Sequence, residues 1–176
     1  MKFIETKLKG AFIIELERLD DERGFFARTF CQREFEEHGL NPKIVQCNMS
    51  FNRKKGTLRG MHYQAFPYEE AKLVRCIKGA IYDVIIDLRP NSIAFKKWLA
   101  VDLTEQNRRM IYIPEGFAHG FQTLRDNTEI FYQMSEFFRP EYARGVRWND
   151  PAFEIEWPIE DPIISTNDLQ HKEFSQ

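Results

Sequence analysis

The segment Lys72–Leu88, KLVRCIKGAIYDVIIDL, indicates the fold class of this chain. It contains two runs rich in β-branched and aromatic residues, 72–77 and 80–88, and Lys78-Gly79 between them is suited to a turn between adjacent strands. Similar short runs lie at 11–16, 98–103, 109–113 and 128–134. Turn-forming residues separate the runs, and no long helical pattern interrupts the series from Gly56 to Pro140. The sequence therefore predicts an all-β fold, either an antiparallel sandwich or a barrel.

Outside this series the sequence predicts one helix and an irregular tail. The helix is expected near Cys31–His38, where Gly39 offers a left-handed stop. The segment after Pro158 is rich in turn-forming and polar residues, and we expect it to wrap over the barrel. Because the chain has no internal repeat and no linker-like stretch, residues 1–176 are expected to form a single domain.

The composition describes a globular chain with little net charge. Of its 176 residues, 43% are hydrophobic and 14% are aromatic, which is enough to bury a core. The formal net charge of -2 at pH 7 provides no overall attraction to nucleic acid or to an anionic membrane. No run approaches the roughly 20 apolar residues that span a bilayer, and the amino-terminal residues lack the apolar stretch of a secretion signal. We therefore expect a cytoplasmic protein without nucleic-acid or membrane partners.

Two of the 4 histidines lie in distinctive surroundings. His62 lies in the sequence GTLRGMHYQ and His119 lies in IPEGFAHGF, both beside glycine-bearing turns. An isolated histidine is most often a hydrogen-bonded core or turn residue. Here Arg59, His62 and Lys72 fall in one stretch of the chain. Two fixed cations beside a potential base are costly in a core but useful in a pocket that binds an anion or stabilises an enolate.

Neither the cysteines nor the histidines indicate a metal site. Cys31, Cys47 and Cys76 are odd in number and widely spaced, so we expect reduced thiols in the core. The spacing Pro114-x-Gly116-x-x-His119 resembles the second motif of the cupin barrels. A metal-binding cupin would have a His-x-His pair in its first motif, but Gln64 stands where the second histidine belongs after His62. We therefore expect no metal.

Several ordered motifs resemble the dTDP-4-dehydrorhamnose 3,5-epimerase family, from about Lys2 to Asp168. They are Asp21–Phe26 (DERGFF), Gln46–Ser50 (QCNMS), Leu58–Gln64 (LRGMHYQ), Lys72–Cys76 (KLVRC), Pro114–Phe121 (PEGFAHGF) and Trp148–Pro151 (WNDP). Each is weak alone, but together they make chance agreement implausible. The resemblance implies a cupin-type antiparallel β-barrel, or jelly roll, with a few short helices.

The family resemblance also implies an activity. It implies an isomerase without a cofactor that removes and returns protons next to the ketone of a nucleotide-linked 4-keto-6-deoxy sugar. The type reaction is the 3,5-epimerisation of dTDP-4-dehydro-6-deoxy-D-glucose. Such reactions belong to deoxysugar pathways such as dTDP-rhamnose biosynthesis, which supply cell-surface polysaccharides.

The resemblance assigns the catalytic residues. His62 is similar to the family's base, and Asp168, in IISTND, matches the aspartate of its His-Asp dyad. Lys72 is similar to the lysine that stabilises the enolate oxygen, and Tyr132 matches the tyrosine that returns a proton from the opposite face. These roles suit the chemistry, because a proton next to a ketone is acidic only when the enolate is stabilised. Without the family, Tyr132 would be interpreted as an ordinary core aromatic residue.

Substrate contacts are implied in the same way. Arg23 and Arg59 resemble diphosphate contacts, a role suited to the planar guanidinium fork. The alternative for Arg23 is a turn residue with a surface ion pair. Asp83 is expected as a supporting partner behind the substrate contacts, with a purely structural role as its alternative. The other substrate-binding residues that we expect are Gln46, Asn48, His119 and Phe138.

Two features depart from the family pattern and leave alternatives open. Arg28 stands where an acidic residue near the nucleotide is usual, and Phe137-Phe138 stands where a tyrosine pair is common. The alternatives are an epimerase that inverts a single carbon, 3 or 5, or uses another nucleotide, and a non-catalytic sugar-nucleotide-binding cupin. The complete set of base, acid and cation favours an enzyme, and the missing ligand pair disfavours a metal-dependent cupin dioxygenase or isomerase.

The family resemblance also implies an assembly. In this family the N-terminal strands cross between subunits and help complete the partner's pocket. We therefore expect a homodimer with exchanged N-terminal strands.

Overall fold

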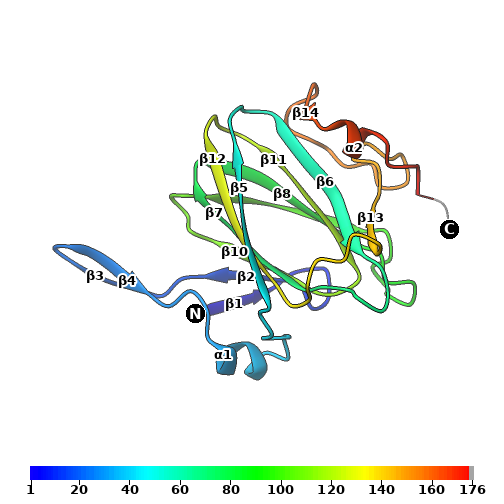
Figure 1. The fold of residues 1–176 in the computed structure, drawn as a ribbon. Coiled ribbons are helices and arrows are strands. Elements are labelled where there is room, and N and C mark those ends of the chain that lie inside the picture. Colours follow the sequence, from blue (N-terminus) through cyan, green and yellow to red (C-terminus); the bar gives the residue numbers. More distant parts are fainter. Residues whose placement is uncertain (175–176) are drawn as a thin grey trace.

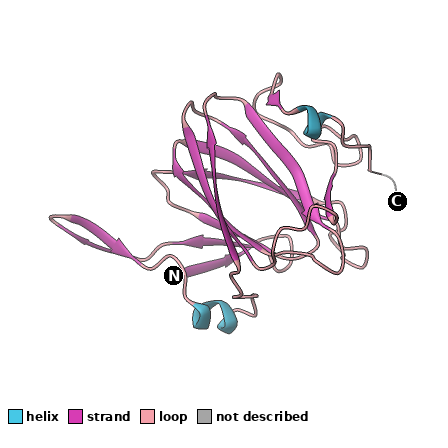
Figure 2. Ribbon diagram, in the orientation of Figure 1, coloured by secondary structure: helices cyan, strands magenta, loops and turns pink. Residues whose placement is uncertain are grey.

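Two sheets of antiparallel strands face each other in the computed structural model, which describes residues 1–174 (Figure 1; Figure 2). The first sheet has the order β1 (Lys2–Glu5), β2 (Phe12–Glu15), β10 (Met110–Ile113), β7 (Lys72–Lys78), β12 (Thr128–Met134) and β5 (Gln46–Asn52). The second has the order β13 (Ala143–Gly145), β6 (Thr57–Gln64), β11 (Phe117–Thr123), β8 (Ala80–Asp87) and β9 (Trp98–Thr104). The short strand β14 (Ile163–Ile164) lies parallel to β6.

The all-β prediction is confirmed, and every run that was expected to form a strand does so. The predicted helix is α1 (Gln32–Glu37), which ends before Gly39 at a φ of 68°. Strands β6 and β11 were not expected, because their sequences mix polar residues with glycine. Each of them lies between two neighbouring strands, and this pairing compensates for their weak local preference. The tail after Pro158 is mostly irregular, as expected, and it also contains β14 and the short helix α2 (Thr166–Leu169).

The space between the sheets is divided into an apolar core and a polar cavity. Alternate residues of a strand face the same side, so Lys72, Val74 and Cys76 of β7 share a face. Val74 and Cys76 belong to the buried core, whereas Lys72 lines the cavity. On β12, Ile130 lies in the core and Tyr132 lines the cavity. The same strands therefore run from the core into the cavity, and core packing fixes the position of the polar groups.

Other parts of the chain cover a portion of the outer face of each sheet. Helix α1 packs Phe35 against Phe3 and Tyr112 of the first sheet, with ring centroids 5.4 Å and 5.9 Å apart. On the second sheet, Phe153 joins Met61 and other buried apolar residues of the outer face. Burying one such side chain contributes about 1.5–3 kcal/mol to folding. Apolar packing thus covers part of each outer face, and the cavity lies between the sheets.

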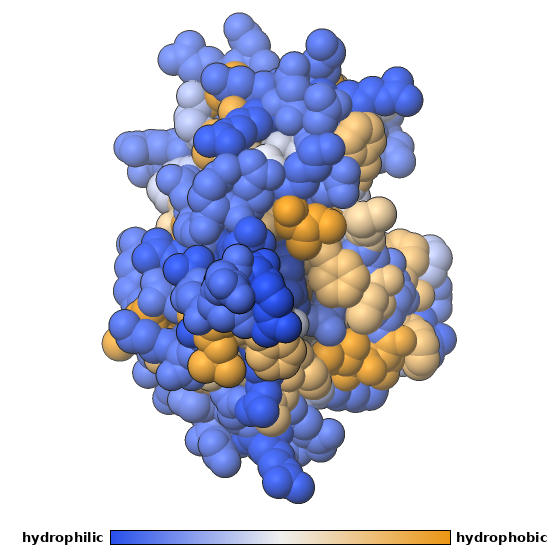
Figure 3. All heavy atoms as spheres, turned by 90° about the vertical axis from the view of Figure 1, so that its left-hand side faces the viewer, coloured by the Kyte–Doolittle hydropathy of each residue, from blue (hydrophilic) through white to orange (hydrophobic). Residues whose placement is uncertain are grey.

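A hairpin projects from this body (Figure 1). Strands β3 (Arg18–Asp21) and β4 (Gly24–Ala27) pair only with each other, as a separate sheet. Leu19 and Phe26 on the hairpin are 71% and 72% exposed. Figure 3 views the molecule from the side on which the hairpin projects, and it shows apolar side chains gathered beside a hydrophilic protrusion. Exposed apolar residues of β5 include Met49 and Phe51. An apolar surface of this kind is typical of a protein interface.

Two further expectations can be compared with the structure. Cys76 is buried, as expected, but Cys47 is exposed and Cys31 is partly exposed, so the prediction of core thiols is wrong for these two. The reason for Cys47 is its place on β5, the edge strand of the first sheet, whose alternate residues point outward. Among the described residues, no helix is long and apolar enough to cross a membrane.

Candidate active site

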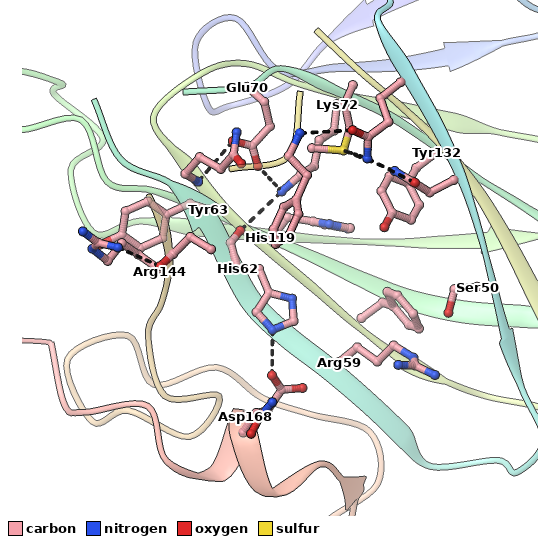
Figure 4. A pocket seen from close by; sticks show the side chains of 18 of the residues that line it. Ser50, Arg59, His62, Tyr63, Glu70, Lys72, His119, Tyr132, Arg144 and Asp168 are labelled. Atoms are coloured by element: carbon pink, nitrogen blue, oxygen red, sulfur yellow. Dashed lines mark hydrogen bonds and ion pairs between the residues drawn. The ribbon is translucent and has the colours of Figure 1, made fainter. Parts of the chain in front are cut away.

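A cavity of about 820 Å³ opens between the two sheets (Figure 4). This volume lies in the range of small-molecule sites. The first sheet lines it with residues of β5, β7 and β12, and the second sheet lines it with residues of β6 and β11. The tail closes it from a third side. The lining includes nearly all predicted site residues, namely Gln46, Asn48, Arg59, His62, Lys72, His119, Tyr132, Phe138 and Asp168.

An irregularity in β6 directs both Arg59 and His62 into the cavity. In a regular strand, residues three positions apart point to opposite faces. Here His62 pairs with His119 of β11, but Arg59 pairs with Phe121, so β6 contains one more residue than β11 over this stretch. Such a bulge turns a side chain to the other face. The arginine and the histidine therefore line the same wall.

His62 and Asp168 form a hydrogen-bonded pair across the cavity wall (Figure 4). Nε2 of His62 lies 2.7 Å from Oδ1 of Asp168, although the two residues are 106 positions apart. The short helix α2 holds the aspartate, because Ser165 Oγ accepts a hydrogen bond of 3.1 Å from the Asp168 amide. The Gly60 amide donates to Oδ2 of Asp168 at 3.4 Å. The carboxylate is thus fixed on both oxygens.

The surroundings of Asp168 determine which nitrogen of His62 can act as a base. Burial alone raises the pKa of the Asp168 carboxyl, but the hydrogen bond and charge of His62, together with the Gly60 amide and the Ser165 side chain, outweigh it, so the pKa is lowered. An ionised carboxylate accepts the proton of Nε2, which leaves the lone pair of a neutral imidazole on Nδ1. Nδ1 points away from Asp168, on the side of Arg59 and Tyr132 (Figure 4). The arrangement therefore presents a base to the cavity.

Lys72 extends from the opposite sheet and is held by a buried partner that the sequence did not predict. Its Nζ lies 2.8 Å from Oε1 of Glu70 and 3.4 Å from the backbone oxygen of His62. Glu70 is buried and also accepts a hydrogen bond from the Gln64 amide. This pairing compensates the cost of burying the ammonium group of Lys72 beside His62.

Tyr132 lies on the wall opposite His62. It belongs to β12 of the first sheet, and the histidine belongs to β6 of the second. Burial raises the pKa of the Tyr132 hydroxyl, with the charge of Arg59 acting in the other direction and that of Glu70 adding to the increase. The hydroxyl is therefore protonated at neutral pH and can donate a proton. Arg59 is oriented by Asn52, whose Oδ1 accepts from the guanidinium Nε at 2.8 Å.

His119 is supported from behind by Asp83. The Nε2 atom of His119 lies 2.9 Å from Oδ2 of Asp83, which is fully buried and does not itself line the cavity. Burial raises the pKa of the Asp83 carboxyl, although the charges of His119 and Lys72 act against the increase. The structure thus places Asp83 behind a cavity histidine and outside the cavity lining.

Arg23 is the expected contact that lies away from the cavity of its own chain. It is at the tip of the β3–β4 hairpin, its side chain is 85% exposed, and it forms a bidentate pair with Asp21, at 3.2 Å and 2.6 Å. This geometry corresponds to the alternative of a turn residue with a surface ion pair. Arg28, which departs from the family pattern, forms an ion pair of 2.7 Å with Glu34 of α1. It does not line the cavity.

Sequence reasoning also missed His171, which lies next to the His62–Asp168 pair. Its ring centroid is 5.8 Å from that of His62, and its Nε2 is 3.7 Å from Oδ1 of Asp168. Burial lowers the pKa of His171, and a charge on His62 would lower it further, whereas Asp168 acts in the other direction. His171 lies three residues after Asp168, and this spacing could have indicated that it is near the site. The spacing is informative only once Asp168 is known to contact His62.

Comparisons with known proteins agree with this geometry. A model of the dTDP-4-dehydrorhamnose 3,5-epimerase family matches residues 5–176. A dTDP-4-dehydrorhamnose 3,5-epimerase from Methanothermobacter thermautotrophicus is 47% identical and covers 97% of this chain and 93% of its own. This chain belongs to the dTDP-4-dehydrorhamnose 3,5-epimerase family.

Solved structures of epimerases of this family have the same fold. The structure of the Bacillus anthracis enzyme, with TDP and PPi bound, has a TM-score of 0.95 and 39% identity over 98% of this chain and 99% of that chain. An enzyme from Legionella pneumophila, in complex with dTDP-4-keto-L-rhamnose, has a TM-score of 0.92 and 36% identity over 98% of this chain and 92% of that chain. The predictions of the family, of a cupin-type jelly roll and of an isomerase of the epimerase type are confirmed.

Proposed function

We propose that this chain is a 3,5-epimerase of dTDP-4-dehydro-6-deoxy-D-glucose. The observation that carries the proposal is the position of His62 and Tyr132 on opposite walls of one cavity, with the ammonium group of Lys72 beside them. Inversion at a carbon requires a proton to leave one face and another to arrive on the other face. A cavity with a proton acceptor on one side and a donor on the other suits this requirement.

The first step forms an enolate. Nδ1 of His62 takes the proton from a carbon next to the C4 ketone, and the bonding electrons move onto the carbonyl oxygen. The ammonium group of Lys72 stabilises the developing negative charge there, and Asp168 stabilises the imidazolium that forms. Both supporting groups are held by hydrogen bonds or ion pairs within the chain, so little reorganisation accompanies the step.

The second step returns a proton to the other face. The hydroxyl of Tyr132 gives its proton to the carbanion carbon of the enolate, and the ketone re-forms as electrons return from the oxygen. The phenolate and the imidazolium then exchange protons with water, which restores both groups. Because C3 and C5 both flank the C4 ketone, the same groups can invert each carbon when the sugar ring is presented in turn. The guanidinium of Arg59 is the cavity group best suited to the diphosphate.

We further propose that the active form is a homodimer in which the β3–β4 hairpin enters the neighbouring subunit. Strands β1 and β2 pair within the first sheet of their own chain, so the projecting hairpin is the N-terminal part free to be exchanged. Its exposed Leu19 and Phe26 have little apolar contact within the subunit. Insertion into the partner would bury them and bring Arg23 to the partner's cavity, where a second guanidinium can bind the diphosphate.

Solvent deuterium exchange tests the division of labour between base and acid. In D₂O with dTDP-4-dehydro-6-deoxy-D-glucose, His62→Ala is expected to abolish both epimerisation and deuterium uptake, because no proton leaves the carbon. Tyr132→Phe is expected to lose epimerisation while it still incorporates deuterium and returns labelled, unepimerised sugar. General acid–base groups contribute about 10² to 10⁴ in rate, so both losses are measurable by mass spectrometry and NMR.

Two matched controls accompany these variants. His38→Ala removes an exposed histidine at the end of α1, and Tyr112→Phe removes a hydroxyl that lies outside the cavity. Both are expected to retain wild-type exchange. If His62→Ala takes up deuterium at the wild-type rate, His62 is not the base, and His119 is the next candidate. Label at only one of C3 and C5 in the wild-type product would make the enzyme a single-carbon epimerase, and no label at either would leave a sugar-nucleotide-binding protein.

A further inference from the structure

We propose that His62, Asp168 and His171 form an inhibitory binding site for a divalent transition metal, with Zn²⁺ as its best-suited ion. The metal-binding part of this proposal is independent of the epimerase function, whereas the inhibition rests on it. The three residues lie at one end of the cavity, where the tail meets β6 and β13. Within residues 1–174 they are the group of histidine, cysteine and carboxylate side chains whose ligand atoms approach closely enough to share one ion.

The ligand atoms lie close enough to share a single ion once the side chains adjust. Oδ1 of Asp168 is 2.7 Å from Nε2 of His62 and 3.7 Å from Nε2 of His171, and all three atoms lie within 4.8 Å of one another. Tetrahedral zinc with ligand bonds of about 2.0–2.2 Å places neighbouring ligand atoms about 3.3 Å apart. The His62–Asp168 pair must therefore open by a few tenths of an ångström, and the His171–Asp168 distance must close by a similar amount. The two histidine nitrogens, which lie within 4.8 Å of each other, must also come to about 3.3 Å apart, so the His171 ring has to move toward His62.

The sequence around His171 brings its ring to this place and leaves its Nε2 without a hydrogen-bond partner in the described chain. A Cβ added to Gly145 would collide with the imidazole of His171, so the glycine lets the ring lie directly on β13. Gly145 is paired with His62 in the register of β13 and β6, which puts the two histidines side by side. Nε2 of His171 is inaccessible to solvent and forms no hydrogen bond within the described chain. A buried ring nitrogen without a partner is costly, and a metal bond would satisfy it.

The ligand set selects the kind of metal. Two imidazoles and one carboxylate suit Zn²⁺ and its neighbours Co²⁺, Ni²⁺ and Cu²⁺, whereas Mg²⁺ prefers oxygen ligands in an octahedron. The cavity beside the three ligands leaves room for a fourth ligand, either water or an oxygen of the substrate. An ion at this place would therefore compete for the position in which the sugar is expected to react.

Binding would also reverse the protonation of the base. To bind the metal, Nε2 of His62 gives up the proton that it shares with Asp168, and Nδ1 takes up a proton from solvent, so the imidazole stays neutral but changes its tautomer. The proton of the imidazole then lies on Nδ1, because Nε2 uses its lone pair on the metal. Nδ1 can no longer accept a proton from the sugar. The ion thus removes the base and occupies its aspartate partner at the same time.

Direct metal binding tests the site without reference to activity. Protein stripped with EDTA and desalted is titrated with Zn²⁺ against a chromophoric chelator, and with Co²⁺ while tetrahedral absorption bands are recorded. The wild-type chain is expected to bind one Zn²⁺ per subunit and to show the Co²⁺ bands. Loss of a partner that merely orients a ligand weakens metal affinity about 10- to 100-fold, so His171→Leu is expected to weaken it at least as much.

Further variants distinguish a lost ligand from a disturbed fold. His171→Gln keeps a polar side chain of similar size but is a poor zinc ligand, and Gly145→Ala retains His171 while displacing its ring. Both are expected to weaken Zn²⁺ binding, with unchanged circular dichroism. His38→Leu, which removes a histidine at the end of α1, is expected to bind Zn²⁺ like the wild type. Equal dissociation constants for the wild type and His171→Leu, or no stoichiometric binding by the wild type, would overturn the site.

Inhibition is measured in parallel. Zn²⁺ is expected to stop deuterium exchange in step with its occupancy of the wild-type protein, Mg²⁺ is expected to have no effect, and EDTA is expected to restore the rate. If Zn²⁺ binds through His171 but epimerisation continues at full occupancy, the inhibitory role is wrong. If no 4-keto sugar nucleotide is epimerised at all, the proposed function fails while the binding measurements still decide the metal site. The two failures are therefore distinguishable.

Discussion

Asp168 and Asp83 each hold the imidazole of a cavity histidine, but the pKa values of their carboxyl groups are shifted in opposite directions. Both groups are buried, and burial raises the pKa of each. For Asp168 the hydrogen bond and charge of His62, the Gly60 amide and the Ser165 side chain outweigh burial. For Asp83 burial prevails, since one of its oxygens has no hydrogen-bond partner in the described chain. The number of donors around each carboxylate accounts for the difference.

This contrast predicts opposite effects of pH on stability. The free energy of unfolding is measured between pH 2 and pH 7 for the wild type, Asp168→Asn and Asp83→Asn. With a folded-state pKa below the ordinary 3.8, Asp168 contributes stability that is present above pH 3.8 and is lost as the pH falls through the folded-state pKa. The advantage of the wild type over Asp168→Asn is therefore expected to shrink on acidification.

The control residue is expected to behave in the opposite sense. With a folded-state pKa above 3.8, Asp83 contributes stability that is fully present below pH 3.8 and is lost as the pH rises through the folded-state pKa. The advantage of the wild type over Asp83→Asn in the free energy of unfolding should thus be largest at acid pH. For each variant, the difference in the free energy of unfolding from the wild type is plotted against pH. If the two plots slope in the same direction, the explanation by the number of donors around each carboxylate is wrong.

At the scale of elements, the contact between β6 and β11 decides where the base lies. Gly60 and Gly120 let the two strands approach closely beside the bulge: a Cβ added to Gly120 would lie 2.6 Å from Met61 Sδ and 2.8 Å from the Arg59 oxygen. Gly60 also has a φ of 131°, which side chains rarely tolerate. The strand irregularity that turns Arg59 and His62 to one face thus depends on the absence of side chains at these positions.

Gly120→Ala is therefore expected to be destabilising and to impair catalysis. Overpacking of this kind costs about 1–3 kcal/mol, because β6 or β11 must move to accept the methyl group. Since that movement shifts His62 relative to Lys72, kcat is expected to fall more than KM rises. Thermal denaturation and steady-state kinetics measure the two effects. If the melting temperature and kcat are both unchanged, β6 and β11 accept the added methyl group without moving, and the proposed dependence on glycine is wrong.

For the molecule as a whole, the projecting hairpin is the feature that a single subunit leaves unexplained. Its apolar side chains are exposed, and its arginine lies away from the cavity of its own chain. Standard interfaces bury a cluster of apolar residues surrounded by a polar rim, and a long hairpin suits an exchange of this kind between identical subunits.

Static light scattering at micromolar concentration is expected to give the mass of a dimer for the wild type. Phe26→Asp places a charge in the expected interface and should shift the protein toward the monomer, with a loss of activity. Phe66→Asp is the matched control, since Phe66 is 80% exposed and lies outside the hairpin. Arg23→Ala should retain the dimer and raise KM for the nucleotide sugar. A monomeric, fully active wild type would exclude the exchange.

The sequence by itself determined the strand-rich fold, the helix that ends before Gly39 and the importance of the segments around His62 and His119. These properties follow from local alternation, turn residues and composition, which report the burial of each residue without knowledge of its partners. The family motifs added Asp168 and Tyr132, which no local pattern singles out. Only the tertiary structure placed Asp168 against His62 across 106 positions of sequence and Glu70 against Lys72.

The bulge in β6 and the position of His171 on Gly145 were likewise decided by the tertiary structure. An odd spacing such as that of Arg59 and His62 predicts opposite faces, and it is the paired strand that reverses this expectation. Contacts of this kind depend on how remote segments pack against one another. Packing is a property of the whole chain, so the sequence near each residue cannot express it.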